Sequence, residues 1–252
     1  MRTIVIIPYI ASQAQGEELP LCIAGWLKHC RADVQLVVVG DSHECLEEYP
    51  EVHFIELPRE TEQTEGNCVK HLEFVRVIRR VLEEYPKAMH FVLTSDDTFA
   101  VADFGMEELA YPKCLGLMRE LPETGNTWIH DKNKTLAMLR EAGIPAPYDF
   151  STHLPYLMDR RKWERIVGQF GMDSNSLVIE DMYYNLYFQK RVPVRLSDGD
   201  TIRGGVWRST PNVETIRGFF LTKTWINCNE AGFVPALREM LEAHYHGKDG
   251  EE

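Results

Sequence analysis

Short apolar runs alternate with amphipathic segments through the first hundred residues of the chain. The runs are rich in Val, Ile and Leu, which is typical of strands buried on both faces of a sheet. Between them, apolar residues recur at the spacing of one helical face. The pattern predicts strands at 3–7, 34–39, 52–57 and 89–93, and helices at 17–30 and 66–85. These repeated strand–helix–strand units predict an α/β fold with a mostly parallel, Rossmann-like sheet flanked by helices.

The pattern becomes more irregular after about residue 100. Prolines interrupt the segment between 145 and 155, and helical periodicity returns only in separate stretches. We expect helices at 132–142, 160–170, 177–189 and 235–245, and strands at 192–196 and 205–208. A chain of 252 residues can form one substantial core. We therefore expect a single domain over 1–252, with a flexible polar tail at 246–252.

Composition and charge limit the classes of function. Hydrophobic residues make up 44% of the chain, enough to offset the entropy of ordering it, which excludes general disorder. The chain has 27 Lys and Arg against 39 Asp and Glu, for a net charge of −12. This balance argues against binding duplex DNA mainly through its phosphates. A polyanion must instead be bound at a local basic patch or through a metal.

The sequence also bears on the cellular compartment. No stretch approaches the roughly 20 apolar residues of a membrane span, and the first apolar run is too short for a secretory signal. The six cysteines are scattered, without a Cys-x-x-Cys pair. This usage is typical of reduced, packed thiols and not of a zinc site. We therefore expect a cytoplasmic protein with no membrane span.

An acidic pair, Asp96 and Asp97, follows the strand predicted at 89–93. In open α/β sheets, ligands bind beyond the carboxyl ends of the strands. Two adjacent carboxylates repel each other unless a cation lies beside them, and oxygen ligands favour Mg²⁺ or Mn²⁺. Such ions also bridge nucleotide phosphates. The alternative is a surface turn or a helix N-cap, where Asp is also favoured.

Further candidates lie in the second half of the chain. Glu180 and Asp181 are neighbours in an aromatic helix, so at most one faces a cleft as a general base, or both form a solvated acidic turn. His153 is either a ligand contact or a hydrogen-bonded structural residue. Arg160 begins a basic run that either neutralises a diphosphate or forms an exposed helix face. The amide-rich stretch 225–230 either caps the last helix or lines a site.

Together these segments resemble nucleotide-sugar-dependent glycosyltransferases of the GT-A fold over roughly residues 3–190. The resemblance lies in the opening strand, the second strand, an Asp-x-Asp-type metal-binding element and a Glu-Asp base motif. The matching segments are 4–9, 37–41, 91–97 and 179–181. Ser95 stands where the first carboxylate of the family's metal-binding element falls. The resemblance implies a nucleotide-binding half at about 1–100 and an acceptor half at about 101–245.

The resemblance also implies roles for single residues. The expected donor is a nucleotide sugar, with a UDP-sugar first, and Mn²⁺ or Mg²⁺ bridges its diphosphate. Asp97, with Asp96, would hold the cation, and Asp96 would also lie near the donor sugar or ribose. Asp181, or Glu180 if the helix faces the other way, would take the acceptor's proton if the sugar configuration inverts. The implied donor contacts are Pro8 and Tyr9 at the base, Asp41 at the base or ribose, and His153 and Arg160 in the donor site.

Three alternatives stay open at this point. Segments 91–99, 148–155 and 225–230 resemble successive blocks of the Stealth-type sugar-phosphate transferases, which transfer a hexose 1-phosphate in capsule or glycan synthesis. A second alternative is a glycosyltransferase acting on hydroxymethylated nucleic-acid bases, since aromatic residues can stack on an extruded base. A third is a non-catalytic nucleotide-sugar-binding module. The expected acceptor is a hydroxyl on a glycan or on a modified base.

Overall fold

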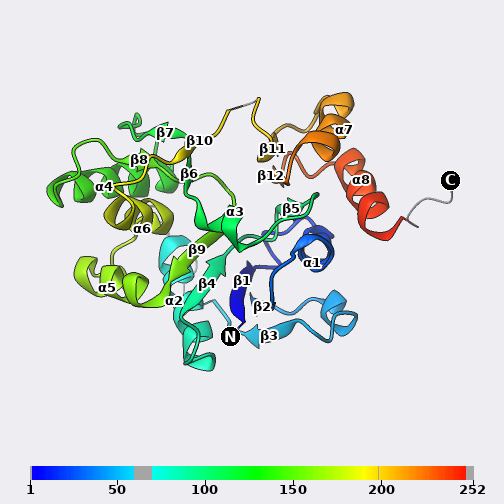
Figure 1. Ribbon diagram of the computed structural model, residues 1–252, viewed down its shortest axis with the longest axis horizontal. Helices are drawn as coiled ribbons and strands as arrows, with labels where there is room; N and C mark the ends of the chain where they lie inside the picture. Colours follow the sequence, from blue (N-terminus) through cyan, green and yellow to red (C-terminus); the bar gives the residue numbers. More distant parts are fainter. Residues whose placement is uncertain (1, 60–69, 198, 248–252) are drawn as a thin grey trace.

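The computed structural model describes residues 2–59, 70–197 and 199–247. Its centre is a five-stranded sheet in the order β3-β2-β1-β4-β9 (Figure 1). The strands are β3 (His53–Glu56), β2 (Val34–Gly40), β1 (Thr3–Tyr9), β4 (His90–Leu93) and β9 (Tyr156–Asp159). The first four are parallel, whereas β9 runs antiparallel to β4. The fold is therefore mixed α/β with a parallel-rich sheet.

The core lies on both faces of this sheet. Because side chains alternate along a strand, Ile4 and Ile6 of β1 belong to one hydrophobic cluster, and Val5 and Ile7 to the other. The first face is covered by α2 (Lys70–Glu84), α4 (Thr127–Glu141), α5 (Arg160–Phe170) and α6 (Ile179–Tyr187). The opposite face is covered by α1 (Glu18–His29) and α8 (Pro235–His246). Burial on both faces explains why the strands are almost continuously apolar.

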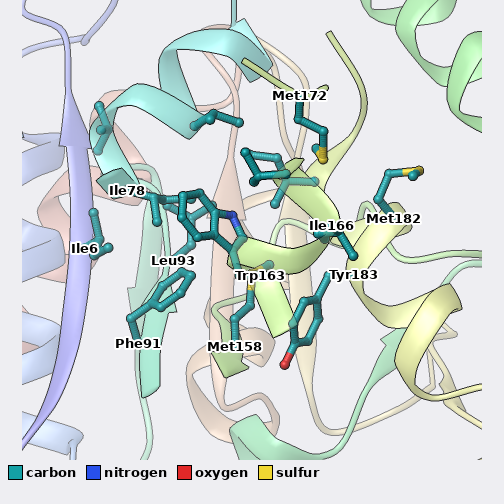
Figure 2. Close-up of a cluster of buried hydrophobic side chains, with 14 of the residues drawn as sticks. Ile6, Ile78, Phe91, Leu93, Met158, Trp163, Ile166, Met172, Met182 and Tyr183 are labelled. Atoms are coloured by element: carbon teal, nitrogen blue, oxygen red, sulfur yellow. The ribbon is translucent and has the colours of Figure 1, made fainter. Parts of the chain in front are cut away.

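Aromatic side chains fill the cluster on the first face. Figure 2 shows Trp163 of α5 beside Ile78 of α2, with Phe91 of β4 near both. The Phe91 and Trp163 rings meet edge to face, with centroids 5.9 Å apart. Tyr183 of α6 lies in the same cluster and accepts a hydrogen bond at its Oη from the backbone N–H of Asp159. These contacts fix α5 and α6 against the sheet.

A second, smaller sheet carries the C-terminal part of the chain. Its order is β11 (Arg203–Val206), β12 (Trp225–Cys228) and β5 (Thr98–Ala100). β5 directly follows the acidic pair, so β12 is brought beside that pair although it lies more than a hundred residues later. The remaining elements are η1 (Glu44–Glu47), α3 (Met106–Ala110), α7 (Val213–Thr222) and the short pairs β6 (Lys113–Cys114) with β10 (Val194–Arg195) and β7 (Gly116–Leu117) with β8 (Tyr148–Asp149).

The structure confirms the four predicted strands of the first hundred residues and the helices at 17–30, 160–170 and 235–245 within one or two residues. The helix predicted at 132–142 begins earlier, at Thr127, because Asn126 caps it by accepting the Trp128 N–H at 2.9 Å. The segment that follows Pro155 forms β9, a strand that the sequence pattern did not predict. The expected first turn at 66–69 and the tail from 248 lie outside the described residues. No helix in the described part of the chain combines the length and apolar character needed to cross a bilayer.

Candidate functional site

The strand order reverses at β1, which has β2 on one side and β4 on the other. In open α/β sheets, the crevice at such a switch point is where ligands bind. A cavity of about 420 Å³ opens there, which we call the main cleft. Its walls come from the end of β1, the segment after β4, and the segment after β12. The lining residues include Pro8, Glu18, Thr94, Ser95, Asp96, Asp97, His153, Trp207, Asn229 and Glu230.

The carboxylate of Asp97 is held by its neighbours. Ser95 Oγ donates to Asp97 Oδ1 at 2.5 Å and lies 3.0 Å from Thr98 Oγ1. The backbone carbonyl of Asp97 accepts from the N–H of Cys228, because β5 pairs with β12. Ser95 therefore orients the Asp97 carboxylate. In the motif that this segment resembles, the position of Ser95 holds a second carboxylate. Asp96 and Asp97 are both half-buried.

The main cleft has a negative potential. Burial raises the pKa of Glu18, and the negative charges of Asp97 and Glu230 raise it further, against a hydrogen bond from Gln15. Burial also raises the pKa of the Cys228 thiol, with Asp97 and Glu18 adding to the effect. The raised pKa values of Glu18 and Cys228 indicate that the cleft would stabilise a positive charge.

The donor set fits a cation that is shared with a ligand. Among the described residues, no three His, Cys, Asp or Glu side chains lie close enough to hold a metal by themselves. Mg²⁺ is commonly held by one or two carboxylates plus substrate phosphates, and Asp96 and Asp97 are suited to that arrangement. Thr94 Oγ1 is buried at the wall of the cleft with no hydrogen-bond partner in the described part of the chain. A bound ligand can satisfy this hydroxyl.

A second cavity of about 120 Å³, the inner pocket, adjoins the main cleft. Ser95, Asp97 and His153 line both cavities, and Glu180 lines the inner pocket. Asp181 has no exposed surface and points instead into a buried network. Its carboxylate accepts from Lys132 Nζ at 2.5 Å and from the backbone N–H of Phe150 at 2.6 Å. Of the two acidic neighbours, Glu180 and not Asp181 therefore faces a cavity, because neighbours on a helix point about 100° apart.

Glu180 adjoins a hydrogen-bond network that is centred on Lys132 and includes its neighbour Asp181. Lys132 Nζ donates to Asp149 Oδ1, Ser151 Oγ and Asp181 Oδ2, at 2.7, 2.7 and 2.5 Å. Burial raises the pKa of Glu180, while the charge of Lys132 and a hydrogen bond from the Ser151 hydroxyl oppose that rise. A carboxyl with a raised pKa is suited to exchange a proton near neutral pH. The sequence contained no signal for Lys132 or Ser151 in this role, since they meet only in the folded chain.

The residues predicted to contact the base and ribose of the nucleotide lie in a side pocket of about 50 Å³. Pro8, Tyr9 and Asp41 line it, and Pro8 also lines the main cleft. Asp41 Oδ2 accepts the backbone N–H of Ala11 at 2.9 Å, which ties the segments after β1 and β2 together. Gly40 has φ +133°, and a Cβ there would lie 2.1 Å from the carbonyl oxygen of Tyr9, so the close approach requires glycine. The structure thus brings these three residues to the edge of the main cleft.

His153 lies between the main cleft and the inner pocket and has a φ of +53°, the one left-handed non-glycine in the described part of the chain. Its carbonyl accepts from Asn227 Nδ2 at 2.5 Å and from Thr98 Oγ1 at 3.3 Å. Its N–H donates to Tyr156 Oη at 3.1 Å. These bonds hold a conformation that costs free energy in most side chains, and such strain is often found at functional sites.

Arg160 does not lie at the cleft, contrary to the prediction. Its guanidinium donates to the carbonyls of Leu82, Tyr85 and Pro86 at 3.1–3.3 Å and pairs with Glu164. The reason is the antiparallel direction of β9, which ends at the amino end of β4 and begins α5 there. Arg160 therefore stabilises the carboxyl end of α2 at the edge of the sheet opposite the acidic pair.

No protein-family model matches the sequence, and no curated protein matches it significantly. The structure is similar to a crystal structure of a glycosyltransferase involved in the glycosylation of the major capsid of PBCV-1, with a TM-score of 0.38 and 14% identity over 97% of this chain and 99% of that chain. It is also similar to the apo-form glycosyltransferase GlyE of Streptococcus pneumoniae TIGR4, with a TM-score of 0.49 and 9% identity over 97% of this chain and 60% of that chain. At these TM-scores neither similarity carries an argument, and the function is argued from the residues of the cleft.

Proposed function

We propose that the chain is a glycosyltransferase that moves a sugar from a nucleotide sugar to a hydroxyl acceptor, with Mn²⁺ or Mg²⁺ bridging the donor diphosphate. One observation carries the proposal. The acidic pair Asp96-Asp97 lines the main cleft at the switch point of the sheet. Asp97 also lines the inner pocket, where Glu180 lies. Two carboxylates suited to a cation and a carboxyl suited to accept a proton thus line adjoining cavities.

The cleft residues divide the work of binding the donor. Pro8, Tyr9 and Asp41 offer a site for the base and ribose beside the main cleft. Asp97, oriented by Ser95, and Asp96 would hold the cation, which when bound neutralises charge on the departing nucleotide diphosphate. The negative charges around Glu18 disfavour a bare diphosphate and favour one that arrives with its cation.

In an inverting transfer, Glu180 would act as the general base for the acceptor hydroxyl. The acceptor oxygen bonds to the anomeric carbon, the bond from that carbon to the diphosphate oxygen breaks, and Glu180 takes the acceptor's proton. Burial raises the pKa of Glu180, and the Ser151 hydroxyl and the charge of Lys132 favour its ionised form against that rise. If the transfer retains configuration, this proton transfer is less necessary, and Glu180 then orients the acceptor hydroxyl.

The test is titration calorimetry with Mn²⁺ and UDP-, GDP-, CMP- and dTDP-sugars, followed by an assay of nucleotide release. We expect one donor class to bind in the presence of the cation, and Asp97→Asn to weaken binding and release. Glu180→Gln should bind the donor normally and lose turnover by about 10²–10⁴-fold in an inverting enzyme. Glu239→Gln, at an exposed position of α8, is the matched control. If no donor binds, or Asp97→Asn binds and turns over normally, the proposal is wrong.

Sugar-phosphate transfer is the second candidate, and one observation favours it. The three segments that resemble Stealth-type blocks converge on the main cleft, where the carbonyl of His153 bonds to Asn227 and the chain at Asp97 pairs with Cys228. The two reactions leave different products. Recovery of a nucleoside monophosphate from a diphospho donor indicates sugar-phosphate transfer, whereas a nucleoside diphosphate indicates sugar transfer. Donor binding with no turnover would indicate a binding module instead.

A further inference from the structure

A cavity larger than the main cleft adjoins it. It measures about 740 Å³ and lies between β11, α7 and the segments that join them. We call it the outer cavity. Trp207 lines both the outer cavity and the main cleft, so the two spaces share this indole as a wall. The volume falls in the range of about 300–1,000 Å³ that is typical of small-molecule sites.

The indole of Trp207 is partly exposed, at 40%, and is held in place. The His153 ring lies 5.7 Å from it, and the Arg203 guanidinium lies over it at 5.9 Å. Arg203 is fixed in turn, because its Nη1 donates to the carbonyl of Thr152 at 2.6 Å. A Cβ on Gly205 would lie 2.2 Å from the indole Nε1, so the ring's close approach to β11 requires glycine. The result is a preorganised aromatic surface beside the reaction space.

Polar groups surround this aromatic surface. Arg208, Asn212 and Thr215 line the outer cavity together with the ring of Phe219. The Asp200 carboxylate, also on the wall, is fixed by the backbone N–H groups of residues 197, 202 and 203. A pyranose ring presents an apolar face of C–H groups and a rim of hydroxyls. An exposed indole with amide, hydroxyl and guanidinium groups around it matches both parts of that surface.

The charge distribution argues against a nucleic-acid acceptor. The net charge of −12 requires a continuous basic strip if DNA is to bind. Three arginines of α2 that such a strip would need are paired with acids instead, at 2.6–2.9 Å. These pairs are Arg76 with Glu73, Arg79 with Asp173 and Arg80 with Glu84. Arg160, from the other half of the strip, bonds backbone carbonyls.

We infer that the outer cavity is the acceptor subsite and that it binds an oligosaccharide. One sugar ring packs against Trp207, and the hydroxyl that receives the donor sugar extends from there through the main cleft to the inner pocket, which Asp97 and Glu180 line. This inference rests on the proposed function, which it makes more specific by naming the acceptor class. It assigns Trp207, Arg208 and Thr215 to acceptor specificity.

The test compares two insertions of the same side chain on α7. Thr215→Trp fills the outer cavity, whereas Val213→Trp adds an indole two residues away, at an exposed position that does not line it. The full-length proteins are applied to an array of defined glycans and of hydroxymethylated duplex DNA. We expect the parent and Val213→Trp to bind the same glycans, and Thr215→Trp to lose roughly tenfold or more in affinity. Arg208→Ala, at an exposed position, gives a second and milder variant and should also weaken binding.

Donor binding with Mn²⁺ is measured on the same preparations by calorimetry and should be unchanged in all variants. Absence of glycan binding by the parent, equal binding by both tryptophan variants, or preference for the modified DNA overturns the inference. Glycan binding without any donor binding overturns the proposed function and leaves the subsite. The two failures are therefore distinguishable.

Discussion

Replacing Lys132 by Met should strongly destabilise the protein. The Lys132 side chain is 2% exposed, and its ammonium group donates to Asp149, Ser151 and Asp181, of which the Asp181 side chain has no exposed surface. Met has a similar length and no charge, so Lys132→Met leaves the Asp181 carboxylate buried without its counter-ion. Removing one partner of a buried ion pair costs about 3–5 kcal/mol, since the remaining charge is not compensated.

The cost translates into a measurable shift. The entropy of unfolding for 252 residues is about 0.5 kcal/mol/K, so 3–5 kcal/mol lowers the Tm by about 6–10 °C. Lys132→Met should lower the free energy of unfolding in urea by the same amount. Asp181→Asn combined with Lys132→Met removes the orphaned charge as well. The double variant should therefore cost less than the sum of the two single changes, by about 0.5–3 kcal/mol.

The assay is urea and thermal unfolding followed by circular dichroism at pH 7.5, with Lys134→Met as the control. Lys134 is only half-buried on the same helix, so its replacement should stay within about 0.5 kcal/mol of the parent. If Lys132→Met also stays within that range, the buried network under Glu180 does not have the energetic role argued for it. Additive single and double variants would lead to the same conclusion.

Three further outcomes are expected. Ser151→Ala should raise the pKa of Glu180, because the hydroxyl stabilises the ionised carboxylate, and so move the acidic limb of the kcat/KM–pH profile to higher pH. His29 and His244 should contribute a loss of stability as the pH falls below about 6.5, because burial lowers the pKa of both and the unfolded chain then binds more protons at these two positions. His244→Phe should weaken this dependence in thermal unfolding. Gly25→Ala should be about 1–3 kcal/mol less stable in urea than Gly168→Ala, because a Cβ at Gly25 would lie 2.7 Å from Tyr245 Oη.

Each outcome has its control. For Ser151→Ala, the exposed Ser209→Ala should leave the pH profile in place, and an unmoved limb in both would remove Ser151 from the argument. For the histidines, whose Nε2 atoms lie 3.0 Å apart, a pH dependence of stability between 7.5 and 5.5 that is the same in His244→Phe as in the parent would contradict the linkage. Gly25 and Gly168 are both helical, so the gain in helix propensity is common to the two, and only Gly25 has a neighbour within 4 Å. Equal stability of these two variants would show that α1 and α8 can separate without cost.

Four of the five strands of the central sheet, and the position of one group of cleft residues, could be predicted from the sequence alone. Continuous apolar runs need burial on both faces, and that requirement follows from local composition. It predicted the first four strands and placed Asp96 and Asp97 beyond the carboxyl end of one of them. The resemblance added Pro8, Tyr9 and Asp41, which the structure places beside the same cleft. These residues lie next to strand ends, so their positions follow from the strands.

The positions of the remaining cleft residues could not be predicted from the sequence. Those positions depend on how segments that are distant in sequence pack and in which direction they run. The antiparallel β9 carries Arg160 to the opposite edge of the sheet, although its charge suggested a diphosphate contact. The rotation of α6 about its axis puts Glu180 in the inner pocket and Asp181 on Lys132. The pairing of β12 with β5, over a separation of more than a hundred residues, forms the far wall of the cleft. Periodicity along one segment specifies which residues are buried, whereas only packing between segments specifies which of them meet.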